Sequence, residues 1–440
     1  MTSNADLAAR SRAAIWHPCT QMARLDAVPP LPIVRGEGPW LIDAEGQRYF
    51  DATSSWWVNL FGHSDAGLQR AIATQAATLP HVMLAGCTHP PAVELAEGLS
   101  ALTGHHLGHA FFGSDGASAT EIALKMSAHH WRNGGQPEKC EFIALRGGYH
   151  GETLGALSVT DVPVFRDAYA PLLRATHLAP ALHEAGSIEA IEALLQQLGG
   201  RCAAVIVEPL IQGASGMRMH APAQLSALRR LCTQHKAHLI ADEIAVGCGR
   251  TGRFFAWEHV QPPLPGTGSQ WPDFILLSKG ITGGTLPLSV VLTTNAVFKA
   301  FLSDEVARGF LHSHSYTGNP IACAAACEVL RRFRDTNLLD ELARQSALLR
   351  AAFAPLADDP RVQALRQVGT VLAFEVPAGG ERFSERFHLA ARKRQLLIRP
   401  IGSTVYLMPP YLIDEVTATW LAAAVRDTLT DTLRPENDSR

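Results

Sequence analysis

The chain has 440 residues, of which 47% are hydrophobic and 18% are charged, and its net charge is −3. A chain of this length can bury a large core without disulfide or metal staples, and this balance is typical of a folded protein rather than a disordered one. A nearly neutral chain without a basic block gives no reason to expect nucleic acid or an anionic membrane as a partner.

The N-terminus is not expected to be a secretory signal. The stretch MTSNADLAARSRAAIW lacks a basic start followed by an apolar block. Residues 30–60 are predicted to form short hairpins, because LPIVRGEGPWLIDAEGQRYFD alternates in polarity and turns at GEG and AEG. We assign residues 1–65 to an N-terminal segment that contributes to a small domain.

The middle of the chain alternates between apolar runs and helical patterns. Runs that are apolar at nearly every position indicate strands buried on both faces, and they lie at 109–112, 141–145, 203–207, 237–241 and 274–277. Helices are predicted between them, for example over 121–131 and 222–235. This alternation predicts an α/β fold, with a mainly parallel sheet flanked by helices in a large domain over 66–325.

The last part of the chain has a different pattern. A long helix is predicted from about Asn319 through Arg334, and a second helix over 340–356. Short alternating segments follow at 371–376, 397–399 and 405–407. The order of these segments predicts a smaller α+β domain over 326–440.

Cysteine usage and hydropathy bear on location. The eight cysteines are scattered and form no CxxC pair, which indicates reduced thiols and a cytoplasmic protein. The uncharged run 281–298 is a poor membrane span, because it contains two glycines, a proline, an asparagine and four threonines. The histidines show no metal-ligand spacing, so no metal is expected.

Polar residues end three of the predicted buried strands. Asp242 follows one strand, Lys279 another, and Glu208 a third. Open α/β sheets bind ligands at the carboxyl ends of their strands, so a carboxylate and a lysine at two such ends are candidates for a site. Position alone leaves open a buried Asp–Lys ion pair without chemistry.

A small-residue loop precedes the helix predicted over 121–131. In FFGSDGASATEIALKM, residues 114–118 are expected to present backbone N–H groups at a helix start, where the helix dipole favours an anion. By itself the loop is more typical of an ordinary N-cap than of an anion site. Together with Lys279 and Asp242 it indicates pyridoxal 5′-phosphate, whose aldehyde binds a lysine and whose ring nitrogen pairs with an acid. Lys279 is then the proton carrier and Asp242 the group that keeps the ring protonated.

A second glycine pattern is excluded as a nucleotide site. Residues 247–252 match GxGxxG after a strand, which is the fingerprint of dinucleotide binding when a helix follows. The continuation RFFAWEHVQPPLPG contains three prolines and leaves no room for that helix. A nicotinamide or flavin enzyme is therefore not expected.

These motifs belong to a longer resemblance, which runs from Ile15 to about Ile413. The chain resembles the class III pyridoxal-phosphate aminotransferases in DATSSWWVNLFGH, RGGYHGETLGALSV, VEPLIQGASGMRM, LIADEIAVGCGRTGRFFA, LSKGITGGTLPLSVVLTT and HSHSYTGNPIACAAA. The resemblance implies fold type I, transaminase activity, and a homodimer with active sites at the subunit interface.

The resemblance also implies roles for single residues. The cofactor-binding positions of the family match Gly116, Ala117, Tyr149, Asp242, Lys279, His314 and Ser315, with Tyr149 stacking on the ring and His314 and Ser315 reaching the phosphate from the second subunit. The catalytic positions are Lys279 and Asp242. The substrate-contacting positions match Cys19, Trp56, Tyr149, Lys279, Ser313, Arg399 and Tyr406.

Within the class, IWHPCTQM, the Trp pair and YLMPPY resemble the members that aminate 8-amino-7-oxononanoate in biotin synthesis. In those members the amino donor is S-adenosylmethionine or, in some, lysine, and Arg399 is expected to face the carboxylate of the oxo-acid. Cys19 stands where many members have tyrosine, and a thiol cannot provide the same stacking face. Ala117 stands for a frequent serine, and Glu152 for a frequent aspartate.

Several alternatives stay open from sequence. Trp56 or Trp57 and Tyr149 could be core aromatics, and Arg399 could be a partner in a surface ion pair. The activity could instead be that of another class III aminotransferase acting on an ω-amino acid, amine or diamine. A pyridoxal-phosphate-binding protein without turnover is a further alternative, and a cofactor spectrum that no amine changes would favour it.

Overall fold

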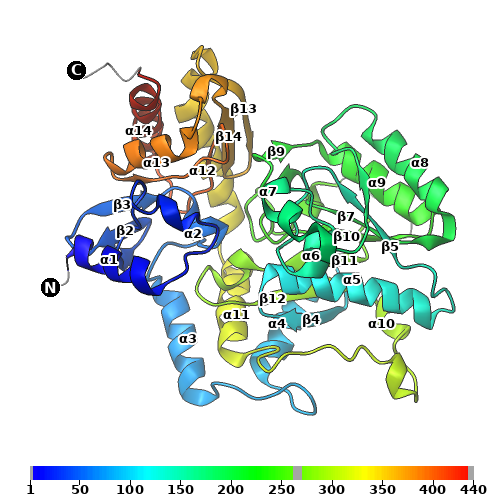
Figure 1. Ribbon diagram of the computed structural model, residues 1–440. Helices are drawn as coiled ribbons and strands as arrows, with labels where there is room; N and C mark the ends of the chain where they lie inside the picture. Colours follow the sequence, from blue (N-terminus) through cyan, green and yellow to red (C-terminus); the bar gives the residue numbers. More distant parts are fainter. Residues whose placement is uncertain (1–2, 261–269, 435–440) are drawn as a thin grey trace. The chain divides into compact units, whose positions relative to one another are not determined.

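The computed structural model describes residues 3–260 and 270–434 (Figure 1). The chain divides into two compact units, one formed by Met1–Ala66 with Leu342–Arg440 and the other by Gly67–Glu341. Residues 326–341, which the sequence analysis placed in the C-terminal domain, cluster with the second unit. The reason is that α11 (Pro320–Asp335) packs along α4 (Pro90–Leu102).

The second unit is built on a seven-stranded sheet in the order β4-β12-β11-β10-β7-β5-β6. Only β12 runs antiparallel to its neighbours, so the predicted mainly parallel sheet is confirmed. The strands are β4 (His109–Gly113), β5 (Glu141–Leu145), β6 (His177–Ala179), β7 (Cys202–Val207), β10 (His238–Asp242), β11 (Phe274–Leu277) and β12 (Ser289–Thr293). Five of them coincide with predicted strands, whereas β6 and β12 were not predicted.

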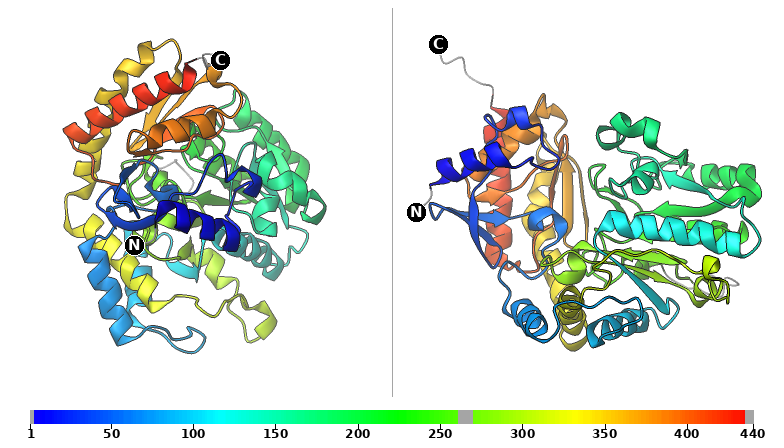
Figure 2. Two further views of the ribbon diagram at one scale, coloured as in Figure 1. Left: turned by 60° about the vertical axis from the view of Figure 1, so that its left-hand side comes forward. Right: turned by 60° about the horizontal axis from the view of Figure 1, so that its bottom comes forward.

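Helices flank this sheet (Figure 2). The longest, α5 (Gly116–Asn133), packs on β11 and β12 through a core that includes Ile122, Leu276 and Val291. It starts five residues before the predicted helix, because the Asp115 side chain caps its first turn. The remaining helices of this unit are α3 (Ala66–Thr78), α6 (Leu154–Ser158), α7 (Pro163–Arg166), α8 (Ser187–Leu198), α9 (Pro222–Gln234) and α10 (Asn295–Lys299).

The first unit is the smaller α+β unit that the sequence predicts. Its four-stranded sheet joins β1 (Ile33–Glu37), β2 (Trp40–Asp43) and β3 (Arg48–Asp51) to β15 (Leu396–Leu397), so that N-terminal and C-terminal segments share one sheet. A three-stranded sheet contains β13 (Gln363–Val368), β14 (Val371–Glu375) and β16 (Thr404–Leu407). The helices are α1 (Asn4–Ala14), α2 (Ser54–Trp57), α13 (Phe383–Arg392), α14 (Glu415–Leu433), and α12 (Leu338–Phe353), whose first turn belongs to the second unit.

The GxGxxG segment does not open a helix of the nucleotide-binding kind. Residues 247–252 form turns, and the next element is the short 3-10 helix Ala256–His259. The prolines that led to this prediction lie outside the described residues.

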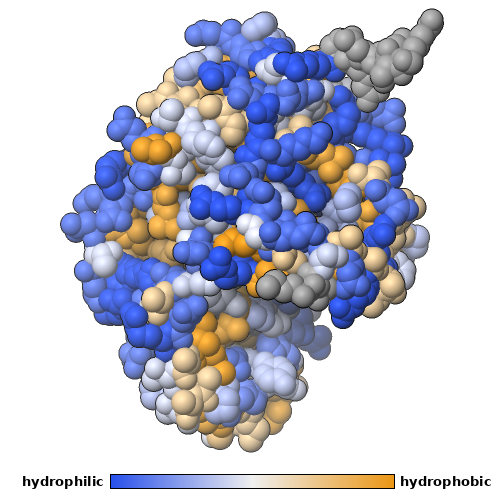
Figure 3. Space-filling model, turned by 90° about the vertical axis from the view of Figure 1, so that its left-hand side faces the viewer, coloured by the Kyte–Doolittle hydropathy of each residue, from blue (hydrophilic) through white to orange (hydrophobic). Residues whose placement is uncertain are grey.

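Within the described parts of the chain, no helix is both long and apolar enough to cross a membrane. On the face that Figure 3 shows, hydrophobic residues lie in scattered groups among hydrophilic ones.

Candidate active site

The sheet register of the second unit brings the three polar strand ends to one edge. Asp242 is the last residue of β10, and Leu276 of β11 lies opposite it. On the other side of β10, Val207 of β7 lies opposite Ala241, so Glu208 leaves the sheet beside Asp242. Since these strands are parallel, Lys279, two residues after the end of β11, leaves at the same edge.

Asp242 is buried and held by two hydrogen bonds. Its Oδ1 accepts from the Ile244 N–H at 3.0 Å, and its Oδ2 lies 2.7 Å from His150 Nδ1. His150 is fixed in turn, because its own N–H donates to Thr160 Oγ1 at 2.9 Å and its carbonyl accepts from Thr120 Oγ1 at 2.8 Å. The carboxylate is therefore oriented before any ligand binds.

His150 is a site residue that the sequence reasoning missed. It follows Tyr149 in the RGGYHGE loop after β5, and the only sequence signal was its place next to a candidate residue. Burial of a histidine beside a buried carboxylate depends on the spacing of β5, β7 and β10, which sequence alone does not provide.

Lys279 is half-buried, and its backbone is strained. Burial lowers the pKa of its ammonium group, while the negative charges of Asp242 and Glu208 oppose that shift. Its φ is 45°, a left-handed value that costs free energy for a side chain of this size and that is typical of functional sites. A lysine whose pKa is lowered exposes more of the neutral amine, the form that attacks an aldehyde.

Glu208 ties the Tyr149 loop to the end of β7. Its Oε2 accepts from the Tyr149 N–H and its Oε1 from the Gly213 N–H, both at 3.0 Å. Burial raises the pKa of Glu208 to about 7. The Tyr149 hydroxyl donates to Glu152 Oε1 at 2.9 Å, so Tyr149 is held both at its backbone N–H and at its hydroxyl group.

The N-terminus of α5 provides a backbone-lined cradle. The Asp115 carboxylate accepts from the Ser118 N–H at 2.9 Å, whereas the N–H groups of Gly116 and Ala117 have no hydrogen-bond partner among the described residues. Space is tight here: a Cβ on Gly116 would lie 3.0 Å from Ile244 Cγ2, and one on Gly151 would lie 2.5 Å from Ala117 Cβ. Asp115 thus caps the helix and still leaves two N–H groups for an anion.

These features fit pyridoxal phosphate. Two N–H groups that are free in the described residues suit its phosphate, a half-buried lysine of lowered pKa suits its aldehyde, and a buried, oriented carboxylate suits its ring nitrogen. In the part of the chain that the structure describes, no group of His, Cys, Asp and Glu side chains is arranged to hold a metal ion.

The segment before α11 carries the predicted second-subunit residues. The His314 N–H donates to Thr317 Oγ1 at 3.1 Å, and His314 Nδ1 accepts from the Tyr316 N–H at 3.2 Å. His314 Nε2 is buried and has no hydrogen-bond partner in the described residues. Ser313 and Ser315 are exposed. This leaves one ring nitrogen of His314 available for another group.

In the first unit, the structure distinguishes the two tryptophans. Trp57 is buried, with 5% of its surface exposed, and its Nε1–H donates to the Tyr406 hydroxyl at 3.1 Å. Trp56 is 54% exposed. Trp57 and Tyr406 therefore belong to the core of the unit, and Trp56 is the aromatic side chain that is free to meet a substrate.

Trp56 and Trp57 both lie in a left-handed turn. The four residues of α2, Ser54 to Trp57, have φ values of 50°, 47°, 72° and 74°. Each left-handed residue costs about 1–2 kcal/mol in an L-peptide, so the turn needs support. The support comes from the fully buried Asp51, which accepts from the Ser55 N–H at 2.9 Å and the Ser55 hydroxyl at 2.7 Å and pairs with His63 at 3.1 Å.

Arg399 and Cys19 both reach the surface of this unit. Arg399 is exposed and makes no ion pair with a carboxylate in the described residues, which argues against the surface ion pair considered from sequence. Cys19 is exposed and has a φ of 48°. Burial raises the pKa of the neighbouring Tyr406 to about 12, and the positive charge of Arg399 partly opposes this shift.

Comparisons with known proteins point to one family. A model described as aminotransferase class-III matches residues 21–429. The adenosylmethionine-8-amino-7-oxononanoate aminotransferase of Helicobacter pylori is 41% identical over 424 residues, which are 94% of this chain and 95% of that protein. The crystal structure of the enzyme with the same name from Methanocaldococcus jannaschii has a TM-score of 0.91 at 32% identity and covers 97% of this chain and 98% of its own. A thermostable (S)-enantioselective omega-transaminase from Thermomicrobium roseum has a TM-score of 0.89 at 30% identity, with 98% and 99% covered.

Proposed function

Because the chain belongs to the class III aminotransferases, which use pyridoxal phosphate, we propose that it transfers an amino group to 8-amino-7-oxononanoate and forms 7,8-diaminononanoate in biotin synthesis. The proposal of this acceptor rests on one observation. Over more than nine-tenths of its length, the chain is similar to enzymes named adenosylmethionine-8-amino-7-oxononanoate aminotransferase. The amino donor we propose is S-adenosylmethionine, and lysine is the alternative.

Each polar residue of the sheet edge has a task in this reaction. Bound pyridoxal phosphate supplies an aldehyde that takes up the amino group and a ring that accepts electrons. Lys279 would hold that aldehyde through its Nζ and would carry the proton that has to be moved in the reaction on the same nitrogen. The Asp242 carboxylate, oriented by His150, would pair with the ring nitrogen and favour its protonated form. Gly116 and Ala117 bind the phosphate through their N–H groups.

The main rival is an ω-amino acid, amine or diamine transaminase, because an omega-transaminase shares this fold almost as closely. The exposed Trp56, the free Arg399 and the YLMPPY segment favour the oxo-acid, which needs an apolar surface along its chain and a cation at its end. Steady-state assays of both acceptor classes distinguish the two reactions.

Assembly and location complete the proposal. We propose a cytoplasmic homodimer in which His314 and Ser315 contact the phosphate bound to the partner subunit. The Nε2 of His314 supports this role, because it has no hydrogen-bond partner in the described residues and is available to a phosphate oxygen.

Replacing Arg399 by alanine is expected to raise the KM for the oxo-acid. The substrate carboxylate lies far from the reacting ketone and needs a remote cation, and arginine offers two parallel hydrogen bonds. Loss of a charge-assisted pair worth about 3 kcal/mol corresponds to an increase on the order of 10²-fold. Steady-state kinetics measures the change, and the half-reaction with the amino donor alone should suffer less.

Arg426→Ala is the matched control, because Arg426 is an exposed arginine of α14 in the same unit. It should leave the KM unchanged. Equal loss in both half-reactions of Arg399→Ala would show that Arg399 supports the fold or the shared site instead of the acceptor carboxylate.

Asp51→Ala is expected to act through Trp56. The substitution removes both hydrogen bonds to Ser55 and the pairing with His63, so the left-handed turn relaxes and no longer presents Trp56. The KM for the acceptor should rise by about tenfold, while cofactor affinity stays the same. A double-mutant cycle with Trp56→Ala provides the check. If the two effects add fully, Asp51 does not position Trp56 and this interpretation is wrong.

A further inference from the structure

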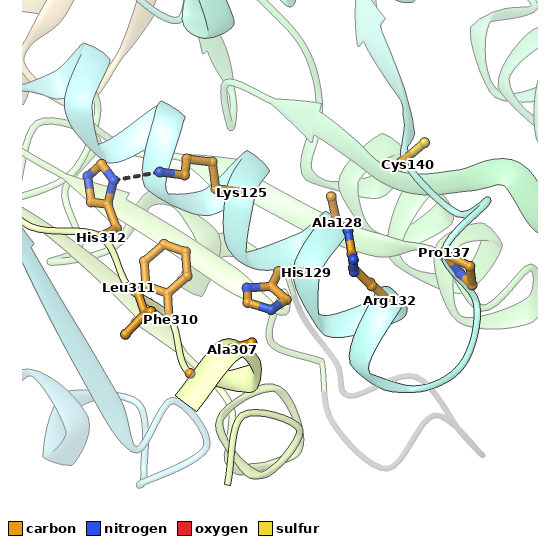
Figure 4. A pocket seen from close by; sticks show the side chains of 11 residues that line it. Lys125, Ala128, His129, Arg132, Pro137, Cys140, Ala307, Phe310, Leu311 and His312 are labelled. Carbon is orange, nitrogen blue, oxygen red and sulfur yellow. Dashed lines mark hydrogen bonds between the residues drawn. The ribbon is translucent and has the colours of Figure 1, made fainter. Parts of the chain in front are cut away.

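The second unit also contains a pocket that lies outside the proposed active site. It has a volume of about 590 Å³, within the range of small-molecule sites. One wall of the pocket comes from α5 and the residues just after it, and the other from residues 307–312. The lining comprises Lys125, Ala128, His129, Arg132, Pro137, Cys140, Ala307, Gly309, Phe310, Leu311 and His312 (Figure 4). None of the predicted cofactor-binding or substrate-binding residues is among them.

The charge of this pocket is of one sign. Its two cations, Lys125 and Arg132, lie on one face of α5 with His129 between them, and the lining contains no carboxylate. Neither Lys125 nor Arg132 makes an ion pair in the parts of the chain that the structure describes. Lys125 Nζ donates to His312 Nδ1 at 2.8 Å, which uses one of its three protons and leaves the others for a ligand.

Apolar side chains form the rest of the lining. The Phe310 ring is packed edge-on against Phe111 with a centroid distance of 5.2 Å, which fixes it in place. Ala128 and Ala307 are small and leave the volume open beside it. Leu311 is 75% exposed, so its side chain is available to cover an apolar ligand. A simple inorganic anion gains nothing from contact with such an apolar surface.

The two walls of the pocket are held together without a ligand. Asn133 Nδ2 donates to the Arg308 carbonyl, and an Arg308 guanidinium N–H donates to the Asn133 carbonyl, both at 2.8 Å. The site is therefore preformed, which lowers the entropic cost of binding.

We propose that this pocket binds a small organic carboxylate with an aliphatic body, the carboxylate between Lys125 and Arg132 and the body against Phe310 and Leu311. The lining segment continues directly into Ser313 and His314, so a ligand here would steady the segment that carries the predicted second-subunit residues. The proposal does not depend on the identity of the transaminase substrate.

The test is calorimetric titration of the holoenzyme with octanoate, acetate and inorganic phosphate. Octanoate should bind at least tenfold more tightly than acetate or phosphate, because only octanoate uses the apolar part of the pocket. The double variant Lys125→Met with Arg132→Met should weaken octanoate binding by tenfold or more. The charge-matched control is Arg70→Met with Lys299→Met, two exposed cations elsewhere in this unit, and it should bind octanoate like the wild type.

Binding of octanoate at the active site contributes equally in the wild type and in both double variants. The difference in octanoate affinity between the two double variants therefore reports on this pocket alone. Equal affinities of the two double variants would overturn the proposal. Equal affinities of octanoate, acetate and phosphate for the wild type would overturn it as well, because the apolar lining would then contribute nothing. Circular dichroism confirms that each variant is folded.

Discussion

Lys279→Ala is expected to abolish transamination in a protein that remains folded. The lysine lies at a buried strand end, and no other lysine follows a strand of the sheet at this edge in the described residues. Loss of its amine removes both the attachment of the aldehyde and the proton carrier. Acid–base catalysis alone contributes about 10² to 10⁴-fold, so activity should fall by at least that factor. Single-turnover assays measure the loss, and thermal unfolding confirms the fold.

Chemical labelling provides an independent measurement of the same assignment. Borohydride reduction of the wild-type holoenzyme followed by peptide mapping should place the cofactor on Lys279. Lys125 and Lys299 are internal controls in the same unit, and both are exposed. A label on either of them in place of Lys279 would refute the assignment.

Asp242→Asn is expected to keep the cofactor and lose most of the activity. Asparagine has the same shape and retains an oxygen for the Ile244 N–H, but it cannot supply the charge that keeps the ring nitrogen protonated. An electrostatic contribution of this kind is worth about 10² to 10³-fold in kcat. Stopped-flow measurement of each half-reaction should show both slowed, since the ring accepts electrons in both.

Asp273→Asn separates this catalytic effect from loss of a buried carboxylate in general. Asp273 accepts from Arg229 at 2.8 Å and lies just before β11, at the opposite edge of the sheet from Asp242. Its replacement should lower the free energy of unfolding, because Arg229 is left buried without its partner, and should leave kcat unchanged. Near-normal turnover in Asp242→Asn would show that Asp242 is only structural.

The parts of the fold that follow from local pattern could be predicted. β7, β10 and β11 are apolar at nearly every position because helices cover both faces of the sheet, and this pattern is visible in sequence. β12 was not predicted, because it lies in a long uncharged run whose glycines and threonines obscure the apolar pattern of the strand. β6 has only three residues, too few for a recognisable period.

Some residues of the candidate site could likewise be predicted from sequence, and others could not. Asp242 and Lys279 stand out because charged residues that directly follow buried strands are unusual. His150 does not stand out, because its pairing with Asp242 joins residues 92 positions apart. The left-handed turn of α2 was also beyond reach, since serine and tryptophan carry no preference for positive φ and the turn depends on Asp51. For the same reason sequence could not tell which tryptophan is buried.

One single-turnover experiment tests the proposed reaction most directly. The enzyme is loaded with pyridoxamine 5′-phosphate, freed of amino donors and mixed with 8-amino-7-oxononanoate, so that the unknown donor plays no part. The proposal predicts about one equivalent of 7,8-diaminononanoate per bound cofactor, identified by mass spectrometry. Absence of the diamine, while pyruvate is converted to alanine by the same preparation, would contradict the proposal and favour an ω-transaminase.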